Sequence, residues 1–159
     1  MLFRSPPPPP RAPAPKVVAA DDGPVSVRDK LLVQRTFAQV ETIAELAAEM
    51  FYNRLFELDP SLRSLFSGDM KEQGRKLMAT LKVAVKGLDD VAKLVPVLQD
   101  LGRRHAGYGV QPAHYATVAE ALLWTLGQGL KDDFTPEMKD AWTNVYSVLA
   151  ETMVVAAGS

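Results

Sequence analysis

The chain has 159 residues, of which 47% are hydrophobic, and this length supports one compact domain with a sizeable core rather than two domains. Lys and Arg number 18 and Asp and Glu number 19, so no basic excess is available to bind a nucleic-acid backbone. The absence of cysteine excludes disulfides, thiolate metal sites and a cysteine nucleophile, and it is compatible with a reducing compartment. Any metal must therefore be held by histidine, by carboxylate or by a cofactor.

Residues 1–24 carry most of the twelve prolines, including the run from Pro6 to Pro10. Proline fixes φ and lacks an N–H group, so we expect a solvated, disordered tail, with a polyproline segment that docks into an aromatic groove as the alternative. The first residues have no apolar core of a signal peptide, and no segment reaches the roughly 18 consecutive apolar residues of a membrane span. We expect a soluble cytoplasmic protein that does not bind a membrane.

From Val25 onward the apolar residues recur at steps of three and four, which predicts two amphipathic helices before Asp59. Pro60 cannot continue the second helix but can begin the next turn, so a short helical segment is expected from Pro60 to Leu65. Further helices are predicted over 69–87, with Asp69 as the N-cap, and over about 91–106.

The last two predicted helices begin near prolines. Pro112 occupies a predicted first helical position, and the helix that it begins is expected to end at Gly127 or Gly129. Thr135 is the expected N-cap of the final helix. No alternation typical of strands, no repeat and no glycine-rich phosphate loop is present. The sequence predicts an all-α domain of about seven or eight helices over residues 25–159.

His105 and His114 are the two histidines of the chain. His105 ends a helical segment just before Gly107, and a neutral imidazole there can serve as an axial metal ligand. One histidine cannot hold a bare zinc ion, but it can hold a haem iron. A lone histidine on a helix is more often a surface residue or a satisfied core residue, and we interpret His114 as exposed. We interpret Tyr108, Trp124 and Trp142 as packing residues.

Several motifs in this helix order are similar to those of the globin family. The segment 51–60, FYNRLFELDP, looks like the second helix and the start of the third in bacterial single-domain globins. The segment 60–66 resembles the turn whose phenylalanine stacks on haem, and 73–78 resembles the distal helix of neuroglobin-like globins. His105 falls at the proximal position. The resemblance covers residues 26–157 and implies a three-over-three globin fold around haem b, iron protoporphyrin IX.

The resemblance also implies a role for individual residues. His105 would bind the iron, and Phe66 would stack on the porphyrin. Gln73 would occupy the distal position over the iron, Tyr52 would point into the distal pocket, and Leu77 would form its apolar wall. Dioxygen draws electron density from ferrous iron, so the hydroxyl of Tyr52 and the amide of Gln73 are suitable donors to it. Two such donors predict tightly bound, slowly released oxygen.

Lys76 lies one step aside from this set, where it would pair with a haem propionate. In flavohaemoglobins and their single-domain relatives, a tyrosine and a glutamate hydrogen-bond the proximal histidine. Tyr115 matches that tyrosine, but the position of the glutamate falls at about Ala157. We therefore expect His105 to donate its other N–H to a backbone carbonyl one turn earlier, near Leu101. This arrangement argues against peroxidase-like cleavage of the O–O bond.

Three functions are compatible with these residues. The first is reversible binding of oxygen and other diatomic gases, including carbon monoxide and nitric oxide. The second is a nitric oxide dioxygenase whose iron is re-reduced by a separate reductase. The third is gas sensing, which needs an output domain or a partner that reads the proline-rich tail. A globin-like scaffold without haem remains the structural alternative. We expect a monomer or a weak homo-oligomer, with no nucleic-acid partner.

Overall fold

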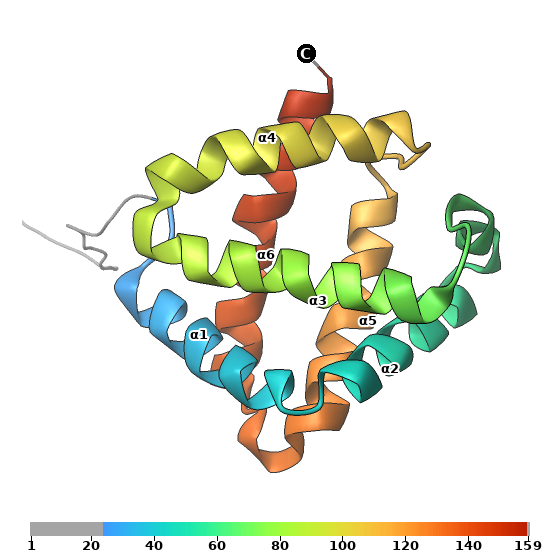
Figure 1. Cartoon of the computed structure of the whole chain (residues 1–159). Helices are drawn as coiled ribbons and strands as arrows, with labels where there is room; N and C mark the ends of the chain where they lie inside the picture. The colour runs from blue at the N-terminus through green and yellow to red at the C-terminus, as the bar shows by residue number, and fades with distance from the viewer. Residues whose placement is uncertain (1–23, 159) are drawn as a thin grey trace, which may run out of the picture.

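The computed structural model describes residues 24–158, so the predicted tail lies outside the described residues except for Pro24. Helices account for nearly all of this part of the chain, and it contains no strand (Figure 1). The α-helices and short 3₁₀ turns are α1 (Val27–Glu41), α2 (Ala44–Leu58), η2 (Pro60–Leu65), α3 (Met70–Gly87), η3 (Leu88–Asp90), α4 (Val91–Gly107), α5 (His114–Leu130), η4 (Lys131–Asp133) and α6 (Pro136–Ala157). The prediction of an all-α domain is confirmed.

Side-chain caps mark where several helices begin. The carboxylate of Asp69 accepts a hydrogen bond from the backbone N–H of Lys71, 3.0 Å away, at the start of α3. The hydroxyl of Thr135 accepts one from the N–H of Met138, 3.2 Å away, at the start of α6. These two caps were both predicted, because a side-chain acceptor followed by a helical apolar pattern satisfies an otherwise unpaired N–H group.

The predicted start of the fifth helix is wrong by two residues. Helix α5 begins at His114, and Pro112 lies in a turn before it. The N–H of His114 donates to the carbonyl of Gln111 at 2.9 Å, and Nδ1 of His114 accepts from the N–H of Gln111 at 2.9 Å. His114 is bonded within its own turn, and its side chain is half-buried rather than exposed as expected. The helix ends at Leu130, one residue after Gly129, which is the later of the two predicted ends.

Figure 1 shows two layers, with α3 and α4 in front and α5 and α6 running behind them at a steep angle. Helices α1 and α2 close the lower side of the molecule. The most extensive helix pairs are α4 with α6, α2 with α5 and α1 with α6. Helix α6 thus packs against both α1 and α4. This arrangement agrees with the three-over-three globin fold.

A buried hydrogen bond ties α1 to α6. Nε1 of Trp142 donates to the hydroxyl oxygen of Thr36 at 2.8 Å, and that hydroxyl donates to the carbonyl of Leu32 at 2.8 Å. The ring of Phe37 packs beside the indole, with centroids 6.5 Å apart. Trp142 and Thr36 are both buried, so the indole N–H has no access to water. Trp142 is a packing residue, as predicted.

Removing this acceptor should destabilise the fold measurably. In Thr36→Val the indole N–H of Trp142 stays buried without a partner, so the free energy of unfolding should fall by about 1–3 kcal/mol. Chemical denaturation followed by circular dichroism measures the change. Thr125→Val is the matched control, because the buried Thr125 hydroxyl bonds only the carbonyl of Ala121 in its own helix. Equal losses of unfolding free energy in the two variants would contradict the role of the Trp142–Thr36 hydrogen bond in joining α1 to α6.

Two other aromatic residues were predicted as packing residues but lie at the surface. Tyr108 follows the last residue of α4 and is 66% exposed, so this prediction is wrong. Trp124 on α5 is 36% exposed, and the guanidinium carbon of Arg54 lies 5.2 Å from its ring centroid. Helical spacing identifies a face of α5, but it does not show whether another helix or a charged side chain covers that face.

Candidate functional site

His105 lies in the last turn of α4, where its ring is half-buried. Its Nδ1 is 2.9 Å from the carbonyl oxygen of Leu101, one turn earlier. The expected hydrogen bond is therefore present, and it places the proton on Nδ1, so that Nε2 keeps its lone pair. Burial lowers the pKa of His105, opposed by the bond to the Leu101 carbonyl. A neutral imidazole with one free ring nitrogen can serve as a metal ligand.

One tyrosine packs beside this imidazole, and a second tyrosine bonds to the backbone of the first. The ring of Tyr115 on α5 is stacked beside that of His105, with centroids 6.4 Å apart and planes 29° apart. The hydroxyl of Tyr146 on α6 donates to the backbone carbonyl of Tyr115 at 2.7 Å. The sequence reasoning missed Tyr146, because in the sequence it is one more residue of the apolar face of α6. Burial raises the pKa of Tyr146, so its hydroxyl remains a donor.

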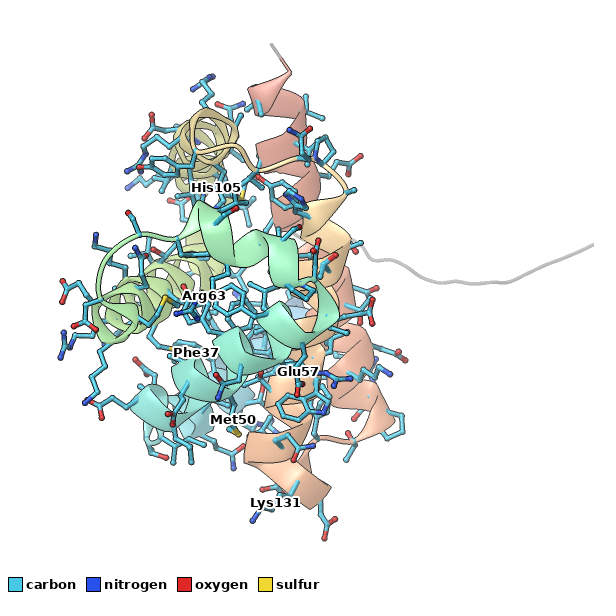
Figure 2. All side chains as sticks on the ribbon, turned by 90° about the vertical axis from the view of Figure 1, so that its right-hand side faces the viewer. Phe37, Met50, Glu57, Arg63, His105 and Lys131 are labelled. Atoms are coloured by element: carbon cyan, nitrogen blue, oxygen red, sulfur yellow. The ribbon has the colours of Figure 1, made fainter. Side chains whose placement is uncertain are left out.

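The opposite side of the site begins at the η2 turn, which precedes Phe66. The carboxylate of Asp59 caps this turn by accepting from the N–H of Ser61 at 3.1 Å, and Pro60 begins it. In Figure 2, His105 is labelled where the end of α4 lies next to η2, above the label of Arg63. A Cβ atom at Gly109 would lie 3.4 Å from a side-chain carbon of Leu65, which supports this proximity.

An aromatic cluster joins α2 to the end of η2. The ring of Tyr52 meets the edge of Phe66 at a centroid distance of 5.2 Å, and Phe56 lies 5.6 Å from Phe66. Phe51 also packs against Tyr52, at 5.1 Å. Tyr52 is only 8% exposed, and burial raises its pKa to about 12. The structure thus brings Tyr52 and Phe66 together, and the phenol of Tyr52 stays protonated at neutral pH.

Gln73 on α3 lies beside Tyr52, but the contact is through its backbone. The hydroxyl of Tyr52 donates to the carbonyl of Gln73 at 3.4 Å. The side-chain amide of Gln73 donates instead to the carbonyl of Ser67 at 3.0 Å, across the start of α3. Both predicted donors are therefore neighbours, and each has an alternative acceptor within the protein.

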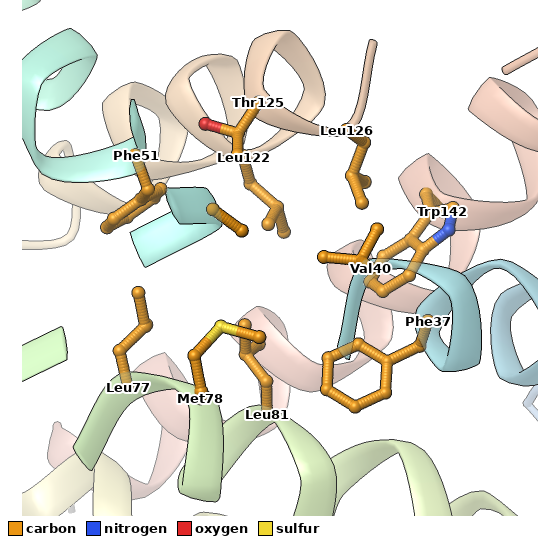
Figure 3. A pocket seen from close by; sticks show the side chains of 11 residues that line it. Phe37, Val40, Phe51, Leu77, Met78, Leu81, Leu122, Thr125, Leu126 and Trp142 are labelled. Carbon is orange, nitrogen blue, oxygen red and sulfur yellow. The ribbon is translucent and has the colours of Figure 1, made fainter. Parts of the chain in front are cut away.

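Leu77 lies one turn further along α3 and borders an interior cavity (Figure 3). Leu77 and Met78 enter it from α3, Phe51 from α2 and Leu122 from α5, and the lining side chains are apolar apart from the Thr125 hydroxyl and the indole nitrogen of Trp142. The full lining is Phe37, Val40, Ala47, Phe51, Leu77, Met78, Leu81, Leu122, Thr125, Leu126 and Trp142. Leu77 thus borders an apolar interior cavity, and its role as the wall of a ligand pocket stays a prediction.

Lys76 is exposed on α3 and forms no ion pair with any residue that the structure describes. Among residues 24–158, no group of three or more histidine or acidic side chains lies close enough to hold a metal ion. A bare metal ion therefore has no set of side-chain ligands in this region. A metal that is already bound within an organic cofactor needs only one imidazole from the protein. None of the described helices is long and apolar enough to cross a membrane.

Comparisons with known proteins identify the family of the chain. The globin family model matches residues 49–153. A neuroglobin of Tetraodon nigroviridis is 33% identical over 143 residues, which cover 81% of this chain and 90% of that protein. A flavohemoprotein of Vibrio cholerae is 28% identical over 131 residues, which cover 80% of this chain but 33% of that longer protein.

Solved structures share the same fold. A protein of Rhodothermus marinus, assigned as a nitric oxide dioxygenase and engineered as a carbene transferase, aligns with a TM-score of 0.76 and 26% identity. That alignment covers 84% of this chain and 94% of the other. A hexacoordinated heme protein from a tardigrade aligns with a TM-score of 0.77 at 21% identity, over 86% of this chain and 97% of the other. The chain belongs to the globin family, and its cofactor is haem.

Proposed function

We propose that this globin binds oxygen and other diatomic gases reversibly, at a haem whose iron is held by His105. The observation that carries the proposal is the hydrogen bond from Nδ1 of His105 to the carbonyl of Leu101, 2.9 Å long. It leaves Nε2 free in a neutral ring, which is the form that binds iron. Haem supplies the iron that takes up the gas and the porphyrin that holds this iron.

The side chains predicted for the site are of the types that such a group needs. Tyr115 stacks beside the imidazole, while Phe66 and Leu77 offer the apolar contacts that a porphyrin face needs and that exclude water. Lys76 is exposed and available to a propionate. The set has the chemical composition of a haem pocket: one imidazole, apolar walls and a basic residue at the surface.

The distal donors would distinguish oxygen from other gases. Tyr52 carries a hydroxyl that stays protonated, and Gln73 carries two N–H donors. Their present acceptors are the carbonyls of Gln73 and Ser67, and rotation of the Tyr52 hydroxyl and of the Gln73 side chain away from these acceptors would free both donors for a ligand. A hydrogen bond to a charged acceptor contributes about 1.5–3 kcal/mol, which supports slow release of oxygen.

The alternative function is that of a nitric oxide dioxygenase supplied by a separate reductase. The similarity to the Rhodothermus marinus protein and to flavohemoproteins favours it. The proximal side favours simple gas binding, because the proton of His105 is held by a neutral carbonyl and Ala157 stands where a glutamate was expected. A carboxylate partner would increase electron donation by the imidazole, and a carbonyl does so less.

Absorption spectroscopy of the haem-loaded protein tests both functions. We expect a Soret band, a ferrous form after anaerobic reduction, and a spectrum with oxygen that reverts when oxygen is removed. Adding nitric oxide to the oxygenated protein and measuring nitrate with and without a reductase separates the dioxygenase from the gas carrier. A protein that shows no Soret band after reconstitution does not have the proposed function.

We also place the protein in the cytoplasm, as a monomer or weak homo-oligomer, with residues 25–159 as its haem-binding domain. The absence of cysteine in the sequence is compatible with the reducing conditions of this location. Sedimentation of the haem-loaded chain over a range of concentrations tests the oligomeric state. Gas sensing would need an output domain or a partner, and a search for proteins bound to residues 1–24 tests for such a partner.

A further inference from the structure

We infer that Gly102 is a positioning residue, which sets where α4 crosses α6 and thereby where the imidazole of His105 lies. The inference rests on the proposed role of His105 as iron ligand. Gly102 has no assigned contact with the gas. The backbone of α6 at Met153 instead determines where α4, and with it His105, lies.

The two helices touch backbone to backbone at Gly102. A Cβ atom on Gly102 would lie 2.3 Å from the carbonyl oxygen of Met153, 2.7 Å from its Cα and 2.8 Å from its carbonyl carbon. All three atoms are main-chain atoms of α6, so no side-chain rotation can relieve the overlap. Glycine is therefore the residue type that permits this crossing.

The backbone conformation of Gly102 gives no other reason for a glycine. Among the described residues, the glycines with a positive φ are Gly68 and Gly109, and Gly102 lies within regular helix. Glycine in a helix interior is less favourable than alanine by about 1 kcal/mol, so the close approach must compensate for this loss. The close approach of the α4 and α6 backbones is therefore the physical reason for a glycine at position 102.

The same peptide unit orients the imidazole. The carbonyl that accepts from Nδ1 of His105 belongs to Leu101, and it forms the peptide bond to the nitrogen of Gly102. The contact with Met153 thus fixes the peptide plane that carries the acceptor of the His105 proton. His105 follows three residues later, about 4.5 Å further along the helix axis.

Helix α6 is itself held in place, so it can serve as the reference. Trp142 bonds to Thr36 on α1, and Tyr146 bonds to the carbonyl of Tyr115 on α5. A displacement of α4 from α6 would therefore move His105 relative to the rest of the site rather than move both helices together.

Gly102→Ala is the direct test. Ordinary contact begins near 3.4 Å, so relief of a 2.3 Å approach needs a movement of α4 by about 1 Å. We expect haem transfer to an excess of apomyoglobin to be roughly 10- to 100-fold faster, as for other changes to the partners of metal ligands. We also expect a shifted iron–histidine stretching frequency in the ferrous protein. Gly107→Ala is the matched control on the same helix, because a Cβ at Gly107 meets no atom within 4 Å.

A second pair of variants separates positioning from general stability. In His105→Gly the ligand is replaced by free imidazole, which no longer depends on where α4 lies. The double variant Gly102→Ala/His105→Gly should then bind haem and imidazole within about twofold of His105→Gly alone, because the free ligand is not attached to α4. A large further loss, or failure of Gly102→Ala to fold, would show that the crossing supports the whole domain, and would overturn the positioning role.

A readout without haem completes the test. The ¹⁵N chemical shifts of the His105 ring report whether Nδ1 carries the proton, and Gly102→Ala should change them in the haem-free chain while Gly107→Ala should not. Unchanged ring shifts together with unchanged haem loss would overturn the inference. Absence of a Soret band in the unmodified chain would instead overturn the proposed function, so the two failures are distinguishable.

Discussion

His105→Ala is expected to abolish stable retention of haem, with haem loss faster than in the unmodified protein by at least roughly 100-fold. The reason is that the chain has one other histidine, His114, whose Nδ1 already accepts a hydrogen bond from the N–H of Gln111 at the start of α5. The substitution also leaves a space of the shape of an imidazole. Addition of free imidazole should therefore restore the absorption spectrum, and titration of this recovery measures the effect.

His114→Ala is the matched control, because it removes the other histidine of the chain. Its Nδ1 accepts a hydrogen bond from the N–H of Gln111, so the side chain stabilises the turn that precedes α5. We expect its spectra to match those of the unmodified protein. A native-like ferrous-oxy spectrum in His105→Ala without imidazole would defeat the assignment of the ligand.

The features of the fold that the sequence predicted are those that depend on near neighbours. The caps at Asp69 and Thr135 depend on residues two or three positions away, and the bond from His105 to Leu101 spans one helical turn. Such contacts follow from the period of the helix once the helix itself is identified. The prediction of an all-α domain was right for the same reason.

The features that the sequence did not predict depend on contacts between helices. The approach of Gly102 to Met153 and the bond from Tyr146 to Tyr115 each join residues that are far apart in the chain. Helical spacing shows which side of a helix is apolar, but it does not show which helix covers that side. Tyr108 was misjudged on the same ground, because a position just after a helix has no defined face.

The roles assigned to the six site residues stay predictions, and the structure refines how they are to be tested. It brings Tyr52, Phe66 and the backbone of Gln73 into contact, whereas the Gln73 amide is bonded to Ser67. The sequence identifies residue types that can donate to a ligand, but the rotamer of an amide at the start of a helix depends on the local acceptors. The consequence is a sharper choice of variants for the distal pair.

Removing either distal donor should raise the oxygen dissociation rate by about ten- to a hundredfold, the equivalent of a hydrogen bond to a charged acceptor. Tyr52→Phe keeps the ring, so the contact with Phe66 is preserved. Gln73→Leu has a similar volume and keeps the backbone carbonyl that anchors the Tyr52 hydroxyl. Each variant thus removes one donor and leaves the position of the other intact. Carbon monoxide accepts hydrogen bonds weakly, so its dissociation should change less.

The double variant shows whether the two donors act on one ligand. If both donate to the same oxygen molecule, the effect of the double variant should depart from the sum of the two single effects, because each bond polarises the ligand that the other binds. Stopped-flow displacement of oxygen by carbon monoxide measures all four rates of the cycle. Tyr108→Phe, the same chemical change at a side chain that is 66% exposed, is the control and should leave the rate unchanged. Unchanged oxygen dissociation in both single variants would mean that neither donor reaches the ligand, and the distal pocket would then have to be assigned to other residues.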